Sequence, residues 1–298
     1  MLLNKEKLKK NLKKFPLFFN FIKKIFIFFN INHAAKLTKI NITETFPLFT
    51  PRSSGSYPAR SKLTISSINK VIPSLSSLQT TLGGKLLQVE SIENCTKTSL
   101  ERKSSEELKL LLESYGSDKT NPHNYHYLYG PILSNKNEIK NIFEIELGTK
   151  NINIVSNMGV DGKVVASLRA FRDYCPNANI VGADIDRQIL FSENHISTYF
   201  VDQTKPETFD YILPNISNEF DLLMDDGLHS PHANINSLIF FLKIVRKGGF
   251  IVIEDIGIEA LPLWQIISLI ITEHKYCCRI FKASGRQATI VFSAQRIE

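Results

Sequence analysis

The chain has 298 residues, 43% apolar and 22% charged, which is an ordinary globular composition with room for one large core or two small ones. Its formal charge of +7 comes from residues 1–40, which hold ten lysines and one acid, whereas the remainder has 26 bases and 28 acids. A body so close to neutral argues against a large nucleic-acid-binding surface, so we expect no nucleic-acid partner. Four cysteines without zinc-binding spacing indicate buried thiols in a reducing cytoplasm.

Residues 1–32 alternate basic and phenylalanine-rich apolar blocks. Lys23 and Lys24 interrupt the apolar stretch, which is too short for a membrane-spanning helix, and no small-residue cleavage site directly follows it. A basic, aromatic segment suits an anionic membrane surface, so peripheral membrane contact through residues 1–32 is one expectation. A tail that is disordered or packs on a partner is the other. We expect a cytoplasmic protein, with membrane association as the alternative.

Residues 41–103 are rich in Ser, Thr and Pro and show little periodicity, so we expect a linker of low order. Ser104 followed by Glu107 has the spacing of a capping box and predicts a helix over residues 104–115. The chain therefore divides into a basic arm (1–40), a linker (41–103) and a folded domain (104–298).

From residue 141 onward, strand-like and helix-like segments alternate. The expected strands are 141–147, 179–183, 197–201, 220–224 and 250–253, and the expected helices are 163–174, 206–213, 233–246 and 261–274. Gly248 and Gly249 are interpreted as the end of the third helix. Residues 277–282 and 288–293 predict a final antiparallel pair.

This order predicts an α/β fold of the Rossmann-like class I methyltransferase type, with a seven-stranded, mostly parallel sheet and helices on both faces. The same order fits dinucleotide-binding dehydrogenases, so function depends on the site.

Each of the five expected parallel strands ends in or next to an acid, at the edge where open parallel sheets bind ligands. These acids are Glu144, Asp184, Asp202, Asp225 with Asp226, and Glu254 with Asp255. Asp184 can accept hydrogen bonds from the two hydroxyls of a ribose, and Gly148 allows a nucleoside close to the backbone. The alternative is that some of these acids only cap helices.

The fourth and fifth strands are expected to be neighbours, so Asp225, Asp226, Glu254 and Asp255 should converge. Clustered carboxylates repel unless they are protonated or bridged by a cation, and oxygen ligands suit Mg²⁺ or Ca²⁺. His229, three residues past Asp226, could accept a proton from a hydroxyl bound to the cation. The alternatives are a structural histidine and separately solvated acids.

Several blocks together resemble the macrocin/mycinamicin-type sugar O-methyltransferases and the related cephalosporin hydroxylase-like group, over about residues 105–295. These blocks are 115–119 with His123 and Tyr129, then 142–148, 166–169, 182–185, 225–229 and 248–255.

The resemblance implies S-adenosylmethionine as cofactor, Mg²⁺ dependence, and a hydroxyl of a sugar or glycosylated small molecule as methyl acceptor. It implies Asp226, Glu254 and Asp255 as metal ligands, with His229 and Asp226 as the catalytic residues and His229 as the base. It places residues 116–119 and 125–129 over the cofactor or acceptor. It also places six residues around the cofactor: Glu144, Gly148, Ser167, Asp184, Asp202 and Gln203.

Glu146 departs from the family pattern, which usually has glycine two residues after the first acid. This departure keeps a second reading open, a non-catalytic protein of the same fold that acts as a membrane-surface or partner-binding module. A nicotinamide-dependent dehydrogenase is disfavoured because Gly148 stands outside any Gly-x-Gly-x-x-Gly run. An iron-dependent oxygenase would require His229, His232 and Asp226 to act as one metal site.

Overall fold

The computed structural model describes residues 42–298, except 160–161 and 284–288. The chain divides between Leu75 and Ser76 into two compact units. The basic arm, including the predicted membrane-contacting segment 1–32, lies outside the described residues. Among those described, no helix combines the length and apolar character needed to cross a membrane.

The segment expected to be a linker contains regular structure. It holds α3 (Tyr57–Thr81), which extends from the first unit into the second, then β1 (Val89–Ser91) and a 3₁₀ turn over Ile92–Cys95. The structure thus differs from the expectation of low order over 41–103. Its Ser- and Thr-rich composition concealed α3, because hydroxyl side chains weaken helical periodicity without preventing a helix.

The helix expected at residue 104 begins earlier, as α4 (Ser99–Tyr115). Its capping box is formed by Thr98, whose hydroxyl accepts from the Glu101 amide at 3.2 Å while the Glu101 carboxylate accepts from the Thr98 amide at 2.7 Å. The prediction that Ser104 caps this helix is therefore wrong. Two capping-box patterns follow each other, and the first gives the longer helix. Glu107 instead pairs with Lys136.

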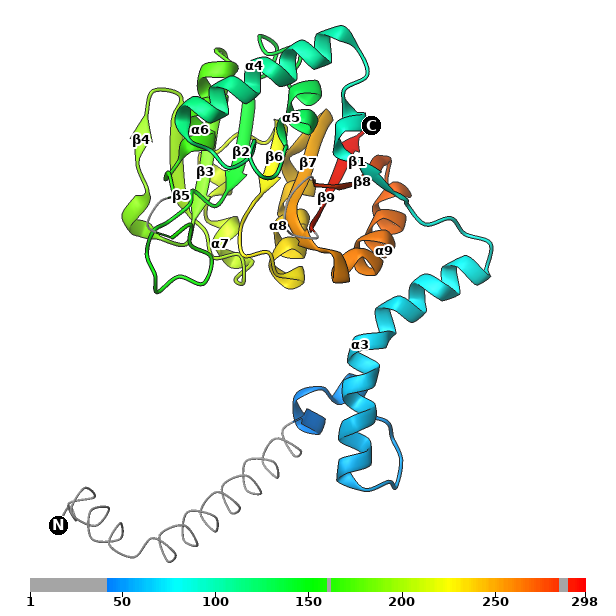
Figure 1. The fold of residues 1–298 in the computed structure, drawn as a ribbon. Coiled ribbons are helices and arrows are strands. Elements are labelled where there is room, and N and C mark those ends of the chain that lie inside the picture. Colours follow the sequence, from blue (N-terminus) through cyan, green and yellow to red (C-terminus); the bar gives the residue numbers. More distant parts are fainter. Residues whose placement is uncertain (1–41, 160–161, 284–288) are drawn as a thin grey trace, which may run out of the picture. The chain divides into compact units, whose positions relative to one another are not determined.

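A nine-stranded sheet runs through the described part of the second unit, in the order β1-β8-β9-β7-β6-β2-β3-β5-β4 (Figure 1). Its longer strands are β2 (Asn141–Ile145), β3 (Asn179–Asp184), β5 (Ile196–Phe200), β6 (Phe220–Asp225), β7 (Val245–Gly257), β8 (Tyr276–Lys282) and β9 (Thr289–Arg296). β2, β3, β5, β6 and β7 are parallel, and β9 is antiparallel to both β7 and β8. These seven match the seven expected strands.

Two short edge strands were not predicted: β1 beside β8, and β4 (Ser192–Glu193) beside β5. Strands of two or three residues carry too little alternation to be recognised. Gly248 and Gly249 also lie inside β7 instead of ending a helix. A Cβ on Gly249 would come within 2.6 Å of the Phe220 carbonyl oxygen, so glycine allows β7 to approach β6 closely.

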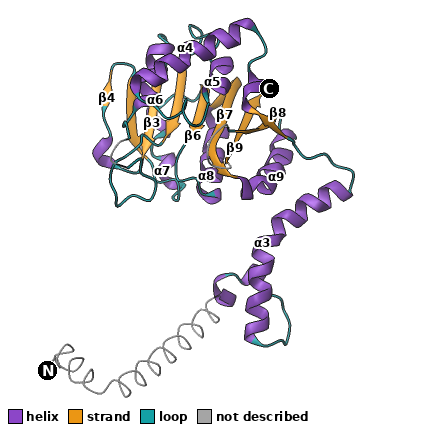
Figure 2. Ribbon diagram, viewed as in Figure 1, coloured by secondary structure: helices purple, strands orange, loops and turns teal. Residues whose placement is uncertain are grey.

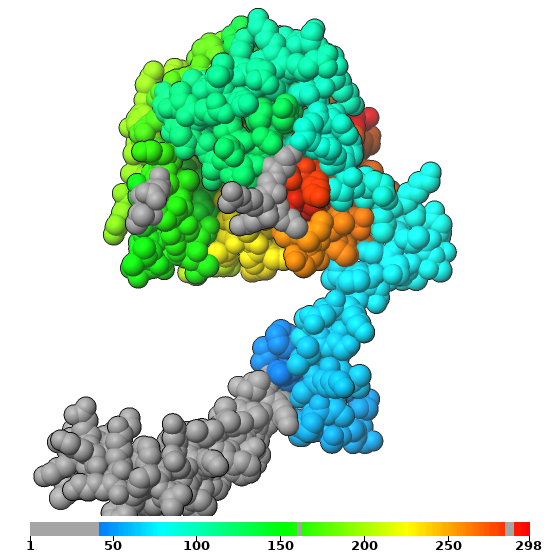
Figure 3. Space-filling model, in the orientation of Figure 1, coloured from blue at the N-terminus to red at the C-terminus, as the bar shows by residue number. Residues whose placement is uncertain are grey.

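Helices cover both faces of the sheet, as predicted (Figure 2). On one face α4, α5 (His126–Ile132) and α6 (Ala166–Tyr174) pack over the strands, and the space-filling view shows α4 and α5 covering them (Figure 3). On the other face lie α7 (Glu207–Asp210), α8 (Pro231–Ile244) and α9 (Leu261–Thr272). Strand residues alternate between these cores, since Ile142 belongs to the first and Phe143 to the second.

His126 is a buried polar residue of α5 that lowers stability in acid. Neither ring nitrogen has a hydrogen-bond partner among the described residues, and burial lowers the pKa of this imidazole to about 4. The unfolded chain takes up the proton near pH 6.5 and the native chain does not, so stability falls as the pH drops from 6.5 towards 4.

We expect His126→Phe to raise the free energy of unfolding by about 1–3 kcal/mol at pH 7.5. The gain should be about 2 kcal/mol larger at pH 5, because the variant has no imidazole to protonate. Urea unfolding of both proteins at the two pH values measures this difference. Equal pH dependence in the two proteins would contradict it.

Candidate active site

The carboxyl ends of β2, β6 and β7 lie side by side. Asp225 is in register with Ile145 of β2 and with Ile253 of β7. The residues that follow these three positions are Glu146, Asp226 and Glu254. They therefore lie at the same edge of the sheet. This confirms the predicted adjacency of the strands on which the acid cluster depends.

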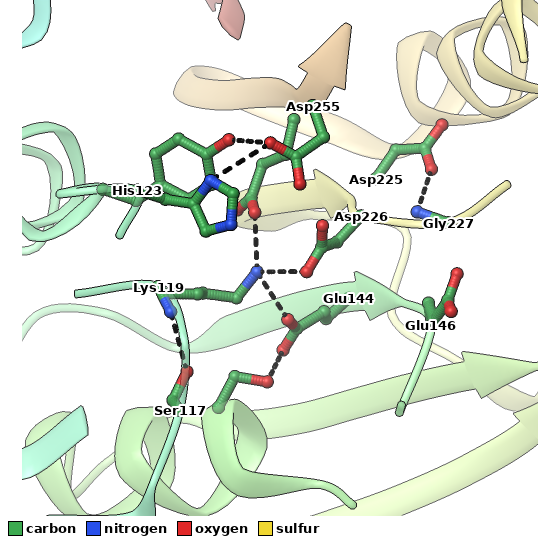
Figure 4. A network of polar contacts seen from close by, with 12 residues as sticks. Ser117, Lys119, His123, Glu144, Glu146, Asp225, Asp226, Gly227 and Asp255 are labelled. Carbon is green, nitrogen blue, oxygen red and sulfur yellow. Dashed lines mark hydrogen bonds and ion pairs between the residues drawn. The ribbon is translucent and has the colours of Figure 1, made fainter. Parts of the chain in front are cut away.

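A buried lysine lies among these acids. The side chain of Lys119 is 2% exposed, and its Nζ is 2.8 Å from Asp226 Oδ2, 2.8 Å from Glu254 Oε2 and 3.1 Å from Glu144 Oε1 (Figure 4). Burial alone would lower the pKa of Lys119, but the carboxylates of Asp226, Glu254 and Glu144 raise it well above its usual value. The ammonium therefore stays protonated at physiological pH.

The segment between α4 and β2 positions this lysine. Gly116 closes α4 with a φ of 75°, a left-handed conformation that glycine adopts readily, and the chain then turns towards the sheet edge. The Tyr125 amide donates to the Lys119 carbonyl at 2.7 Å, which ties the turn to the start of α5. From α5 the Tyr129 hydroxyl donates to Glu254 Oε1.

Strand parity explains which acids meet Lys119. Glu144 shares the sheet face of Ile142, and Asp226 and Glu254 share the faces of Met224 and Val252, two residues earlier on their strands. All three therefore point towards the face of the sheet that α4 and α5 cover. Lys119 lies in the segment between these two helices.

Asp225 has the opposite parity and points to the α8 side. It accepts from Gln203 Nε2 at 2.7 Å, from the Gly227 amide at 3.0 Å and from Asn234 Nδ2 at 3.0 Å. The expected convergence of Asp225 with Asp226 is therefore wrong, and Figure 4 shows Asp225 directed away from Lys119. Asp225 instead holds the turn after β6 in place.

A second group of ligand atoms lies nearer the surface. Asp226, His229 and Asp255 each offer one atom, all within 4.8 Å of one another. His229 and Asp255 have φ values of 53° and 48°, left-handed conformations that are unfavourable for residues other than glycine. Strained backbone of this kind often accompanies functional sites. At Asp255 it directs the side chain into this group, although regular alternation after Glu254 would direct it to the other face of the sheet. Asp255 also accepts from the Tyr125 hydroxyl and lies 3.4 Å from His123 Nδ1.

A pocket of about 300 Å³ opens beside Asp184. Its apolar wall includes Ile154, Ile185, Val201 and Leu228, and its polar lining includes Asp184, Asp202, Gln203 and Thr204. The Asp184 carboxylate accepts from the amides of Leu147 and Asp186, both at 2.7 Å, and burial raises its pKa. These bonds fix its orientation at the pocket wall, and each carboxylate oxygen keeps a second lone pair.

Two of the expected cofactor residues have structural partners. Gln203 donates to Asp225 and to Ser237 Oγ and accepts from the Leu228 amide at 2.8 Å, so its side chain mainly supports the turn. The Asp202 carboxylate accepts from the Thr204 amide at 3.0 Å and lies 2.9 Å from Lys205 Nζ. Both residues nevertheless line the pocket beside Asp184.

A second pocket, of about 160 Å³, adjoins the first. Its lining includes the remaining expected residues and the lysine: Lys119, Glu144, Gly148, Ser167, Asp226, His229 and Asp255. The Ser167 hydroxyl donates to Glu144 at 2.7 Å. All predicted site residues except Glu254, which is buried behind Lys119, therefore line one of the two pockets, with Asp184, Asp202 and Gln203 in the first and the others in the second.

Glu146 lies on the boundary and lines both pockets. Its carboxyl oxygens are 2.7 and 2.9 Å from Ser156 Oγ, which is also 3.1 Å from the Gly227 carbonyl oxygen. Burial raises the pKa of Glu146 to about 9. A serine hydroxyl has one proton, so a neutral Glu146 that donates to Ser156, which then donates to Gly227, satisfies all three groups. Glu146 thus lies between the two pockets and leaves the one beside Asp184 open.

Part of this chain is similar in sequence or in fold to known proteins. A stretch of 89 residues is 35% identical to mycinamicin VI 2''-O-methyltransferase of Micromonospora griseorubida, which is 30% of this chain and 22% of that protein. The match thus spans about a fifth of the length of the curated relative. No protein-family model matches the chain.

Among solved structures, the methyltransferase MycE of the mycinamycin pathway, in complex with Mg, S-adenosylhomocysteine (SAH) and mycinamycin VI, is similar. The TM-score is 0.50 at 21% identity, over 63% of this chain and 54% of that one. A second MycE structure, with Mg and SAH, has 27% identity and a TM-score of 0.43 over 50% and 36% of the two chains. The strand order and the first likeness show that the second unit has the class I methyltransferase fold. The chain is similar to the mycinamicin-type O-methyltransferases.

Sequence reasoning missed the roles of four residues: Lys119, His123, Tyr125 and Tyr129. The resemblance placed the segments of Lys119, Tyr125 and Tyr129 over the site, but not their contacts with the acids, and it gave no place to His123. One signal was present, because an excess of buried acids needs a cation, and a lysine can supply it as well as a metal.

Proposed function

We propose that this chain is an S-adenosylmethionine-dependent, Mg²⁺-dependent O-methyltransferase that acts on a hydroxyl of a sugar or glycosylated small molecule. One observation carries the proposal. Two adjoining pockets lie at the carboxyl edge of the sheet, one beside Asp184 and the other beside Asp226, His229 and Asp255.

The larger pocket suits the adenosine part of the methyl donor. Its aliphatic side chains can cover an adenine, and Asp184 and Asp202 can accept from ribose hydroxyls. The amino-acid part of the donor would then extend past Gly148 into the smaller pocket. There its positively charged sulfonium would lie near carboxylates, which favour a cation.

The group of ligand atoms from Asp226, His229 and Asp255, which we call the outer group, fits a magnesium ion. Mg²⁺ is usually bound through one or two carboxylates together with water and substrate, and Asp226 and Asp255 supply two. When bound, the ion would lower the pKa of an acceptor hydroxyl. Glu254, a metal ligand by resemblance, has one carboxylate oxygen bound by Lys119 and the other by Tyr129, so we assign it to the support of the site.

His229 would act as the general base. It is exposed, lies in the same group of ligand atoms, and can accept the hydroxyl proton at its ring nitrogen as the acceptor oxygen attacks the sulfonium methyl. The remaining residues orient the reactants, which is the main requirement when the methyl group is already activated.

Two measurements test the proposal: isothermal titration with SAH, with and without Mg²⁺, and transfer of labelled methyl groups to a panel of glycosides that includes mycinamicin VI. We expect saturable binding of SAH and Mg²⁺-dependent labelling of at least one glycoside. No heat at high micromolar SAH would reject the function. Tight SAH binding without any transfer would favour the non-catalytic module, the reading that Glu146 keeps open.

Glu146→Gly is expected to tighten SAH binding about tenfold, or about 1.4 kcal/mol. Glu146 has a φ of 76°, a conformation natural to glycine, and its side chain lies between the two pockets that the donor would span. Isothermal titration of the variant measures the change.

Glu146→Gln is the matched control. It keeps the size of a carboxyl group that is already neutral, so we expect SAH affinity within about threefold of wild type. Weaker binding by the glycine variant would show that Glu146 supports the donor.

A further inference from the structure

We propose that Lys119 occupies an inner cation position of the site and so restricts divalent-ion binding to Asp226 and Asp255 of the outer group. The inference rests on the proposed function only in assigning a divalent ion to that outer group. Lys119 would then be a positioning residue that takes the place of a second metal ion.

The contacts of Lys119 resemble a coordination sphere. An ammonium has three N–H donors, and Lys119 Nζ has three carboxylate neighbours at 2.8–3.1 Å, which come from β2, from the residue after β6 and from β7. A hard divalent cation prefers this kind of oxygen set, at shorter distances. Lys119 thus satisfies the inner acids without a metal.

Glu254 shows that the inner position is closed. Its side chain is fully buried, Lys119 binds one carboxylate oxygen, and the Tyr129 hydroxyl donates to the other. Tyr129 and Lys119 are themselves 0% and 2% exposed, so neither can leave without a rearrangement of the core. Glu254 therefore cannot ligate an ion at the outer group while these contacts persist.

Asp226 links the two positions. Lys119 binds its Oδ2, while Asp226 also contributes to the outer group with His229 and Asp255. The lysine therefore fixes the orientation of the one acid that both positions share. The family resemblance instead implies that Asp226, Glu254 and Asp255 bind one ion together, so the two arrangements make different predictions for Glu254 and Lys119.

The first test is the stoichiometry of Mn²⁺ binding to the full chain, measured by electron paramagnetic resonance without donor or acceptor. We expect one Mn²⁺ for the wild type and two for Lys119→Met, which keeps the length of the side chain but removes its charge. Lys119→Met with Glu254→Gln should return to one ion. An unchanged count and affinity in folded Lys119→Met would overturn the proposal, as would two ions in the wild type.

The second test does not depend on the folding of Lys119→Met. Glu254→Gln should keep Mn²⁺ affinity within about fivefold of wild type, whereas Asp255→Asn should lose at least about tenfold. A loss in Glu254→Gln as large as that in Asp255→Asn would overturn the proposal.

Failure of the proposed function remains distinguishable. If wild type binds no Mn²⁺ but Lys119→Met binds one, the inner position is established and the metal-dependent function fails. If SAH does not bind, the methyl-transfer assignment fails whatever the Mn²⁺ count.

Discussion

Replacing His229 by alanine is expected to slow methyl transfer by about 10²–10⁴-fold. His229 is the histidine beside Asp226 and Asp255 in the outer group, and the reaction needs a group that accepts the proton of the acceptor hydroxyl. SAH affinity should stay within about threefold of wild type, because His229 does not line the pocket beside Asp184, which we assign to the adenosine part of SAH. The rate of label transfer and isothermal titration measure the two effects separately.

His232→Ala is the matched control for this prediction. His232 lies one position into α8, with its Nε2 3.5 Å from Asn236 Nδ2, and does not belong to the outer group. We expect it to keep the wild-type rate. Equal losses in the two variants would point to a structural effect on the turn after β6, and a wild-type rate in His229→Ala would show that another group accepts the proton.

Much of the framework could be predicted because it depends on local patterns. Alternating strands and helices define the parallel sheet, and the acids at its carboxyl edge follow directly from where each strand ends. Asp184 and Asp226 could be assigned in this way, since each needs only the end of its own strand and the order of the neighbouring strands. The edge strands β1 and β4 were not predicted because two or three residues are too few to show an alternating pattern.

Side-chain direction at the strand ends was harder to predict. Asp225 and Asp226 are adjacent in sequence, yet Asp225 joins Gln203 and Asn234 on the α8 side whereas Asp226 meets Lys119 on the α4 side. The parity of β6 contains this information, because Leu223 and Met224 also point to opposite cores. Asp255 does not follow the alternation of side chains along β7, because its backbone is left-handed. No simple sequence pattern predicts such a backbone.

The contacts of Lys119 depend on tertiary structure. Lys119 precedes Asp226 by 107 residues and Glu254 by 135, so no local period relates them. The charge argument predicted a divalent cation among the acids and did not consider a lysine in that place. The structure places the lysine among Glu144, Asp226 and Glu254, with Asp255 further out beside His229.

Asp226→Asn is expected to reduce methyl transfer by at least about 100-fold at limiting Mg²⁺, and removal of divalent ions by EDTA should reduce the wild type to a similar extent. Asp226 supplies one of two carboxylates to the outer group and also binds Lys119, so the substitution weakens both contacts. Steady-state rates over a range of free Mg²⁺ measure the effect. If the loss arises from the ion, high Mg²⁺ should partly restore the variant, whereas loss of the Lys119 contact alone would leave the rate insensitive to Mg²⁺.

Asp210→Asn controls for the loss of one negative charge. Asp210 pairs with Lys243 on the surface of α7, away from both pockets, and its substitution should leave the Mg²⁺ dependence unchanged. Undiminished wild-type turnover in excess EDTA would contradict the metal-dependent reaction.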